Sequence, residues 1–220
     1  IQLMVDVSVH RHALEALNFT FFFAPAFHPV FKTIMPARKA LAAEGQKTIF
    51  NLLGPMINPA QPKYQLMGVY SRSWIDPIAE AMDALKLNGG MIVHGVPVPN
   101  SALDELSCAG ENYHRGFGAL SDHSGVLDFV TAELSKCDAE DLKGGSVHEN
   151  VAMLFDFANN KGATIKQGLR DSIYLNVAAG FLSVGKVANL REGVHLATKI
   201  VEEGHLLEWL NQVKAFYLDI

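Results

Sequence analysis

The sequence predicts an α/β fold, in which a mostly parallel central sheet is flanked by helices and carries a few antiparallel strands at one edge. Residues 65–70 and 90–95 are short apolar segments of the kind that form buried strands. Between them, residues 75–85 repeat apolar side chains at helical spacing. This order is a βαβ unit, whose two strands run parallel with a right-handed crossover. With 220 residues and 49% hydrophobic content, the chain can bury the core of one domain spanning residues 1–220.

The elements before this unit are predicted to be mostly helical. A first helix covers residues 9–17, because apolar side chains recur at helical spacing, and Asp6 or Ser8 can cap its first turn. Residues 18–23 are rich in phenylalanine and favour a strand. Short helices are then expected at residues 30–35, 37–43 and 47–53, the last ending at the Gly54-Pro55 break.

The elements after this unit are predicted to change from strands to helices. Residues 106–132 alternate apolar residues with Gly, Ser and Asn, which predicts short antiparallel strands at one edge of the sheet. Residues 213–218 are compatible with either a strand or the end of a helix. Helices are expected at residues 151–158, roughly 163–184, 190–203 and 206–212.

Composition argues against several functional classes. The net charge of −5 and the absence of a Lys/Arg-rich run argue against a nucleic-acid binder. The longest apolar run, residues 19–29, contains Pro25 and His28 and is far shorter than the ~20 residues of a membrane span. The chain opens without the basic segment of a signal peptide. It begins with Ile rather than Met, which suggests a fragment or a processed chain.

The cysteine pattern and the absence of three common motifs argue against several further kinds of site and reaction. Cys108 and Cys137 belong to no C-x-x-C pair, so we expect inert thiols, no zinc site and a cytoplasmic location. The chain lacks a P-loop, a G-x-G-x-x-G turn and a G-x-S-x-G elbow. Nucleotide-triphosphate hydrolysis, dinucleotide redox chemistry and serine hydrolysis therefore lack their signatures.

Arg38 is the first candidate for ligand binding. A guanidinium grips a carboxylate through two parallel hydrogen bonds, a geometry that lysine does not match. Arg38 follows Pro36 on a segment leading to Gly54-Pro55, where glycine permits close approach of a ligand and proline offers a stiff apolar wall. His28 is a further candidate for the wall of this pocket. The alternatives are a surface arginine, a simple helix end and a packing histidine.

Asp104 and Glu105 are the candidates for metal binding. Two neighbouring carboxylates supply the hard oxygen ligands that suit Mg²⁺ rather than zinc. They follow the buried strand that ends at His94-Gly95, and ligands of parallel α/β sheets collect beyond the carboxyl ends of strands. The alternative is an acidic pair on a solvated loop. Gly144-Gly145, ahead of Glu149, offers either a backbone site for phosphate or a tight turn with a helix cap.

These motifs, in this order, resemble those of anthranilate phosphoribosyltransferase over nearly the whole chain. The likeness corresponds to the C-terminal two thirds of that family. Besides Arg38, Gly54-Pro55 and Asp104-Glu105, it includes a set of shorter matches. They are Val5-Asp6-Val7-Ser8, Phe23-Ala24-Pro25-Ala26-Phe27-His28-Pro29, Leu142-Lys143-Gly144-Gly145, Glu149-Asn150-Val151-Ala152, Leu175-Asn176-Val177-Ala178-Ala179 and Leu190-Arg191-Glu192-Gly193.

The resemblance implies a nucleoside phosphorylase/phosphoribosyltransferase-like α/β domain and a reaction of tryptophan biosynthesis. The amine of anthranilate displaces pyrophosphate from phosphoribosyl pyrophosphate (PRPP) through an oxocarbenium-like state. Carried over by motif, Arg38 holds the anthranilate carboxylate, and Gly54, Pro55 and His28 line its pocket. Asp104 and Glu105 bind the Mg²⁺ that accompanies PRPP. No residue is assigned as a catalytic acid or base, since catalysis is by positioning and charge stabilisation.

The same resemblance sets limits on what this chain contains. The family's G-T-G-G-D, Asn-x-Ser-Thr and Lys-His-Gly-Asn-Arg motifs precede the matched region and have no counterpart here. The N-terminal helices that carry the dimer contact of the family are also absent, so a homodimer is expected for the complete enzyme. The loop before Asp104, residues 95–101, is longer than usual. We therefore expect the 220-residue chain alone to have little or no transfer activity.

Two other functions remain open at this point. A pyrimidine nucleoside phosphorylase shares the general architecture, but it needs a phosphate-binding lysine and serine set and a base-reading Arg/Lys pair that the chain lacks. The chain is also compatible with a non-catalytic binding or assembly module derived from the enzyme. Intact Arg38, Gly54-Pro55 and Asp104-Glu105 favour the transferase over both.

Overall fold

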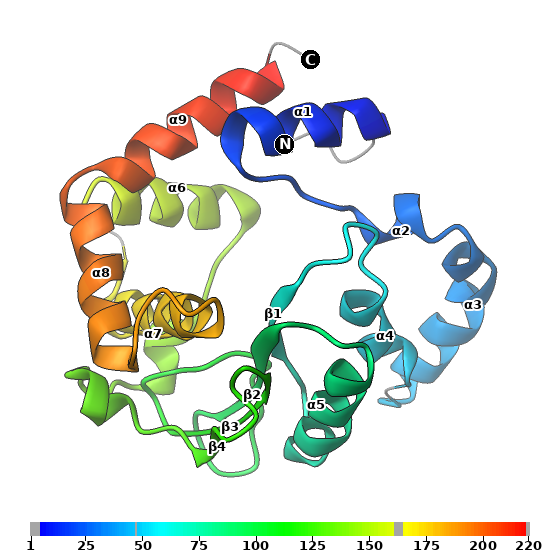
Figure 1. Ribbon diagram of the computed structural model, residues 1–220, viewed down its shortest axis with the longest axis horizontal. Coiled ribbons are helices and arrows are strands. Elements are labelled where there is room, and N and C mark those ends of the chain that lie inside the picture. Colours follow the sequence, from blue (N-terminus) through cyan, green and yellow to red (C-terminus); the bar gives the residue numbers. More distant parts are fainter. Residues whose placement is uncertain (1–4, 47, 161–164, 219–220) are drawn as a thin grey trace. The chain divides into compact units, whose positions relative to one another are not determined.

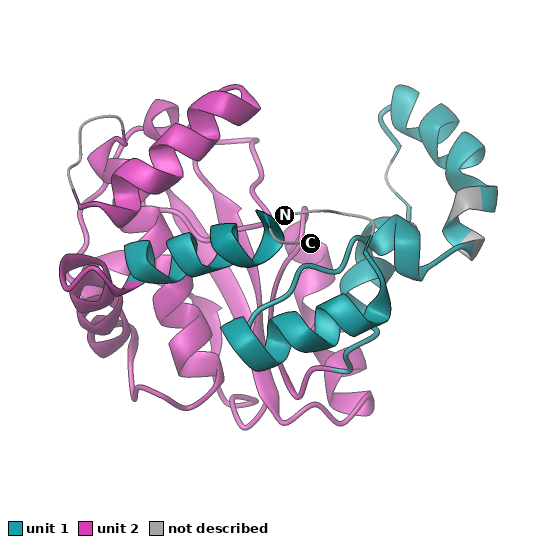
Figure 2. Ribbon diagram, turned by 90° about the horizontal axis from the view of Figure 1, so that it is seen from above, with its two compact units in different colours: residues 1–61, 206–220 teal, residues 62–205 magenta. Residues whose placement is uncertain are grey.

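The computed structural model describes residues 5–46, 48–160 and 165–218 (Figure 1). The chain divides into two compact units, which Figure 2 colours separately. One consists of residues 1–61 and 206–220, and the other of residues 62–205. Each unit is described by itself, and one domain over residues 1–220 stays a prediction. No helix in the described ranges is long and apolar enough to cross a membrane.

The larger unit is built on a four-stranded mixed sheet with the strand order β1-β2-β3-β4. Its strands are β1 (Tyr64–Gly68), β2 (Gly89–Val96), β3 (Glu111–Gly118) and β4 (Ser124–Val126). Strand β1 pairs with β2 in parallel, across helix α5 (Ile75–Ala84), so the predicted βαβ unit is confirmed. The antiparallel pairs β2–β3 and β3–β4 form the predicted edge. The α/β class is confirmed, but the sheet of the described residues has a smaller parallel part than expected, a single pair.

Helices cover both faces of this sheet. Helix α5 packs on β2 and β3, where Arg115 of β3 reaches Asp76 and Glu80 of α5 at 3.1 and 3.3 Å. Helix α7 (Gln167–Ser183) packs on β1 and β2 from the other side, and α8 (Leu190–Glu202) packs along α7 (Figure 1). Strand β2 is buried between these layers from Gly89 to Gly95. The unit also contains α6 (Val147–Ala158) and the 3₁₀ helices η1 (Arg72–Trp74), η2 (Phe129–Ala132) and η3 (Ala139–Leu142).

The smaller unit is helical in its described residues. It contains α1 (Val7–Leu17), α2 (Ala24–Phe27), α3 (Val30–Ala43), α4 (Phe50–Met56) and most of α9 (His205–Leu218). The expected cap of α1 is present, because the Asp6 carboxylate accepts the Ser8 N–H at 2.8 Å. Ala13 and Leu17 of α1 share a buried cluster with Val213 and Tyr217 of α9. Residues 213–218 are therefore the end of a helix, not a strand.

The strand predicted at residues 18–23 is wrong, because these residues form no ladder with another strand. Their aromatic rings pack against helix side chains instead. The Phe22 ring stacks on His10 of α1 at 5.1 Å and meets Phe27 edge-on at 5.0 Å. Phe19 packs edge-on against Trp209 at 5.2 Å. Aromatic side chains favour strands through the surface that they bury, and here helices provide that surface.

Two prolines that were expected to end helices lie inside them. Pro36 lies within α3, so the helices predicted at residues 30–35 and 37–43 are one helix. Gly54 and Pro55 lie within α4, so the predicted Gly-Pro turn is also wrong. The residue before a proline is pushed out of helical geometry by a clash of its Cβ, and Gly54 has no Cβ. The helix continues past Pro55, where the Ile57 N–H donates to the Leu53 carbonyl at 3.1 Å.

We predict that Gly193→Ala lowers the free energy of unfolding by about 1–3 kcal/mol, because a methyl group at this crossing overpacks the core. A Cβ on Gly193 would lie 2.7 Å from Ala178 Cβ and 2.8 Å from its Cα, so α8 could approach α7 only by a backbone shift. Gly180→Ala is the matched control, since a Cβ there meets nothing within 4 Å. This control should gain about 0.5–1 kcal/mol from helix propensity. Equal denaturation midpoints for the two variants would contradict the prediction.

Candidate functional site

Asp104 and Glu105 line a cavity of about 400 Å³ in the larger unit. The cavity opens at the carboxyl end of the parallel pair, where Gly68 ends β1, and its other wall is helix α7. Both acidic residues are exposed. Because ligands of parallel sheets collect beyond the carboxyl ends of the strands, this is the position that the sequence predicted for the acidic pair.

Two glycines allow the acidic loop to cross directly over the ends of β1 and β2. A Cβ on Gly68 would lie 1.3 Å from the Asp104 carbonyl oxygen, and one on Gly95 would lie 2.4 Å from the Glu105 carbonyl oxygen. Leu103 and Gly95 also exchange two backbone hydrogen bonds of 2.9 and 2.8 Å. Only residues without side chains permit this close contact. The glycines therefore fix the height of the loop above the sheet.

Helix α7 holds the loop from the side of the cavity. The Asn176 side chain accepts the Leu106 N–H at 3.1 Å and donates to the Leu106 carbonyl at 2.7 Å. One helical turn earlier, the Ser172 hydroxyl accepts the Cys108 N–H at 3.0 Å. Because Leu106 and Cys108 are buried, water cannot serve their backbone groups, and these side chains of α7 supply the hydrogen-bond partners instead.

Asn112 of β3 holds the backbone of Ser107, the residue between Leu106 and Cys108, in the same way. Its side chain accepts the Ser107 N–H and donates to the Ser107 carbonyl, both at 2.8 Å, and it is fully buried. Three consecutive residues after the acidic pair are thus anchored by three side chains. The backbone of the loop is held, while the carboxylates of Asp104 and Glu105 remain in solvent.

Sequence reasoning missed these anchoring residues. Asn176 belongs to the matched segment Leu175-Asn176-Val177-Ala178-Ala179, but nothing local assigned it a role. Ser172 and Asn112 were not singled out. The signal that could have found them is a polar residue on a helix or strand face that is otherwise apolar, since a buried amide or hydroxyl requires a hydrogen-bond partner.

The donor set of the acidic pair fits magnesium. Two exposed carboxylates supply hard oxygen ligands, and within the described ranges no group of three or more His, Cys, Asp or Glu residues could hold a metal ion. Magnesium usually keeps several waters and is bound through one or two carboxylates together with substrate phosphates. A pair of this kind is therefore suited to a cation that arrives with a phosphorylated ligand.

The other predicted site residues lie in the smaller unit. Arg38 lies in the middle of α3, is half-buried, and has no ion pair or hydrogen-bond partner within the described part of the chain. The His28 ring lies beside the Phe31 ring, with centroids 5.4 Å apart. Gly54 and Pro55 lie in α4. The structure brings Asp104 and Glu105 to one cavity, and a common pocket for the other four residues stays a prediction.

Gly144-Gly145 forms a capped turn, one of the two alternatives left open above. The Asn150 side chain accepts the Gly145 N–H at 2.8 Å and donates to its carbonyl at 3.1 Å. Ser146 and Glu149 form a reciprocal capping box at the start of α6. The backbone groups that phosphate would need are thus partly engaged by side chains.

His94 contacts a backbone carbonyl, and both cysteines have a raised thiol pKa. His94 is buried, and its Nδ1 lies 2.8 Å from the Val69 carbonyl oxygen. Burial raises the pKa of the Cys108 thiol to about 12 and also raises the pKa of Cys137 above its ordinary value. Both thiols are therefore protonated near neutral pH, which makes them poor nucleophiles.

Comparison with known proteins identifies relatives along the whole chain. Residues 1–207 match the family described as "Glycosyl transferase family, a/b domain". Anthranilate phosphoribosyltransferase of Petrotoga mobilis is 34% identical over 209 residues, which cover 95% of this chain and 57% of the relative. The corresponding protein of Phenylobacterium zucineum is 39% identical over 196 residues, 87% of this chain and 53% of the relative.

Solved structures show the same fold. Anthranilate phosphoribosyltransferase of Thermus thermophilus superposes with a TM-score of 0.82 at 35% identity, over 94% of this chain and 58% of the other. The enzyme of Saccharomyces cerevisiae, solved in complex with PRPP and Mg, superposes with a TM-score of 0.83 at 22% identity. The match covers 98% of this chain and 59% of the yeast chain. The chain thus spans between half and three fifths of the length of these relatives.

We predict that Asn176→Ala lowers the free energy of unfolding by about 1–3 kcal/mol, because it leaves the buried N–H and carbonyl of Leu106 without partners. Amide hydrogen exchange at Leu106 should accelerate in this variant. Asn159→Ala is the control, since the Asn159 amide also donates to a backbone carbonyl, that of Phe155 at 2.8 Å, but is exposed. Unchanged protection of Leu106 in Asn176→Ala would show that this side chain does not hold the loop.

Proposed function

Because this chain belongs to the glycosyl transferase family, we propose that the protein containing it is an anthranilate phosphoribosyltransferase. The reaction joins the amine of anthranilate to ribose C1 of PRPP and releases pyrophosphate, as a step of tryptophan biosynthesis. The observation that carries this proposal is the anchored acidic pair at the carboxyl end of β1 and β2. The names of the relatives in several bacteria, at 34–39% identity, support the same reaction.

In this proposal Asp104 and Glu105 hold the Mg²⁺ that accompanies PRPP. When bound there, Mg²⁺ would supply positive charge to offset the negative charge that develops on the departing pyrophosphate. What the chain contributes is placement, since the loop is fixed by Gly68 and Gly95 from below and by Asn176 from the side. A rigid seat for the phosphates removes part of the entropy loss of bringing two substrates together. The yeast relative that was solved with PRPP and Mg supports this choice of ligand.

Arg38 is proposed to hold the carboxylate of anthranilate, with Gly54, Pro55 and His28 around the ring. A half-buried guanidinium without a protein partner in the described part of the chain is free to bind an anion. The fork of the guanidinium matches a carboxylate in two bonds, which fixes the orientation of the ring and therefore of the neighbouring amine. The amine of anthranilate is a nucleophile with an available lone pair, so this chain needs to orient it rather than to deprotonate it first.

To test this function, the complete polypeptide is incubated with anthranilate, PRPP and Mg²⁺, and the consumption of anthranilate and the release of pyrophosphate are measured. Consumption of anthranilate with release of one pyrophosphate for each molecule consumed is the expected result. Turnover of a pyrimidine nucleoside with phosphate, without anthranilate transfer, would replace the proposal by the phosphorylase. Binding of anthranilate without transfer by the complete polypeptide would indicate a non-catalytic module.

We predict that the double variant Asp104→Asn, Glu105→Gln weakens Mg²⁺-dependent binding of PRPP by about tenfold to a hundredfold, since hydrogen bonds and contacts of charged groups are worth about 1.5–3 kcal/mol. The amide side chains keep the shape of the loop, because it is the backbone carbonyls of both residues that rest on the glycines. Calorimetry with and without Mg²⁺ measures the effect. Asp138→Asn, at an exposed acid that makes no capping bond, is the control. Equal Mg²⁺ dependence in all three proteins would remove the acidic pair from the site.

We predict that Arg38→Ala raises the KM for anthranilate by roughly 30-fold, the equivalent of about 2 kcal/mol for a lost charge-assisted pair, with little change in the KM for PRPP. Arg38→Lys should recover only part of the loss, because an ammonium group cannot form the two parallel bonds. Lys39→Ala, at the exposed neighbouring cation, is the control. An unchanged anthranilate KM in Arg38→Ala would exclude this arginine from the pocket.

A further inference from the structure

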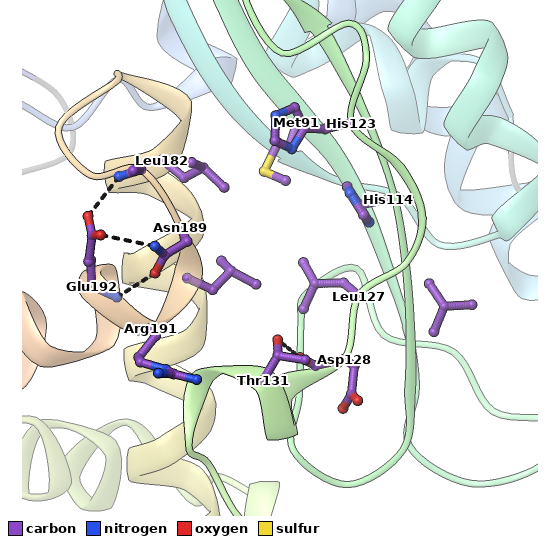
Figure 3. Close-up of a pocket in the computed structure, with 13 residues that line it drawn as sticks. Met91, His114, His123, Leu127, Asp128, Thr131, Leu182, Asn189, Arg191 and Glu192 are labelled. Atoms are coloured by element: carbon purple, nitrogen blue, oxygen red, sulfur yellow. Dashed lines mark hydrogen bonds between the residues drawn. The ribbon is translucent and has the colours of Figure 1, made fainter.

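A second cavity, of about 720 Å³, lies in the larger unit and shares no lining residue with the cavity of the acidic pair (Figure 3). One wall is the β3–β4 hairpin with the segment that follows it, and the other is the corner between α7 and α8. Met91, which belongs to the lining, precedes Val93 of the acidic-pair cavity on β2, so this hollow lies farther from the carboxyl end of the strand. Its volume is within the range of about 300–1,000 Å³ that is typical of small-molecule sites.

The interior of this cavity is mostly apolar, although it includes the buried Nδ1 atom of His114, which has no hydrogen-bond partner among the described residues. Met91, Leu127 and Leu182 are almost fully buried, and Leu190 extends the apolar wall at the start of α8. Burial, and then the proximity of His123, lowers the pKa of His114, which favours an uncharged imidazole at neutral pH. A flexible methionine beside imidazole rings is a surface that adapts to a flat or branched apolar group. The interior therefore suits an uncharged apolar or aromatic body.

The rim of the cavity carries opposite charges on its two walls. Figure 3 shows Arg191 on the side of α8 and Asp128 on the side of the hairpin, with Thr131 between them. The Arg191 Nε atom pairs with Glu133 at 3.4 Å, and its two terminal nitrogens form no ion pair or hydrogen bond with any described residue. One Asp128 oxygen accepts the Val130 N–H at 2.9 Å, and the other has no hydrogen-bond partner within the described ranges.

Glu192, the third charged residue of the lining besides Arg191 and Asp128, already has hydrogen-bond partners for both carboxylate oxygens. One Glu192 oxygen accepts the Ala188 N–H and the other accepts the Asn189 side-chain amide, both at 3.0 Å. Among the Asp, Glu and Arg side chains of the lining, the groups without a partner in the described residues are thus one end of the Arg191 guanidinium and one Asp128 carboxylate oxygen. A ligand with a single charge would satisfy only one of them, whereas a zwitterion with both charges close together would satisfy both.

We propose that this cavity binds a free α-amino acid with a large apolar or aromatic side chain. Its carboxylate pairs with Arg191, its ammonium group pairs with Asp128, and its side chain lies among Met91, Leu127 and Leu182. The site is separate from the proposed phosphoribosyl chemistry, and the ligand is bound without being transformed.

Calorimetry on the 220-residue chain tests the proposal with three amino acids and two analogues. L-tryptophan, L-phenylalanine and L-leucine are the probes. Indole-3-propionate lacks the ammonium group of tryptophan, and tryptamine lacks its carboxylate. Saturable binding of at least one amino acid at one site per chain is expected, with both analogues weaker than L-tryptophan by about tenfold or more. No saturable binding of any of the three amino acids would overturn the proposal.

Two variants assign the charges to the two ends of the ligand. Arg191→Gln should weaken binding of L-tryptophan and indole-3-propionate by about tenfold and leave tryptamine unchanged. Asp128→Asn keeps an oxygen for the Val130 N–H, and it should weaken L-tryptophan and tryptamine but not indole-3-propionate. Lys186→Gln, which removes an exposed charge outside the lining, is the control for both. If both variants weaken every ligand equally, or neither weakens L-tryptophan, the assignment is wrong.

A third variant tests the location without changing a charge. Ala188 is exposed and belongs to the lining, and its backbone N–H rather than its side chain bonds to Glu192. Ala188→Trp should therefore fill the cavity and abolish binding while near-ultraviolet circular dichroism still reports a folded chain. Undiminished binding of L-tryptophan by this folded variant would place the amino acid elsewhere and overturn the proposal.

Discussion

The constraint on which the proposed chemistry depends is the close contact between the acidic loop and two strand ends that lack side chains. Gly68 and Gly95 let the carbonyl groups of Asp104 and Glu105 rest on the sheet, at positions where any Cβ would collide with them. The contact alone would leave the following backbone groups buried and unpaired. Asn176 and Ser172 of α7 and Asn112 of β3 supply those partners, so three side chains from two elements hold the loop. Its carboxylates are thereby presented to solvent on a fixed backbone.

Helix α7 connects this arrangement to the rest of the larger unit. Its central turns provide Ser172 and Asn176 to the acidic loop, whereas its last turn provides Leu182 to the second cavity. At its middle, Ala178 is small enough for Gly193 of α8 to come into contact. The helix is therefore buried along most of its length, and Ser172, Asn176 and Ser183 bond to the loop or to the backbone of the helix itself. Both proposed ligands would lie against the same rigid element.

The sequence predicted well those features that depend on neighbouring residues. The apolar segments around α5 predicted the βαβ unit, and Asp6 predicted the cap of α1, because these signals act within one or two turns of the chain. The location of Asp104 and Glu105 followed from the strand before them. The strand predicted at residues 18–23 was wrong because its aromatic rings pack on helix surfaces instead. The predicted Gly54-Pro55 turn was wrong because glycine tolerates helical geometry before proline. Asn176 lies 70 residues from Leu106, so no local pattern could have paired them. The same holds for Arg191 and Asp128, which only the folded chain brings to one rim.

The central claim is that the fixed acidic loop is a seat for a divalent cation that arrives with phosphate. Paramagnetic broadening of backbone amide signals by Mn²⁺, which replaces Mg²⁺ at oxygen sites, tests this most directly on the 220-residue chain in the presence of PRPP. The account predicts strong broadening of the signals of residues 104–108 and of the Asn176 side-chain amide, with the signals of α8 unaffected. Broadening that is absent from residues 104–108, or equally strong at exposed acids throughout the chain, would contradict it.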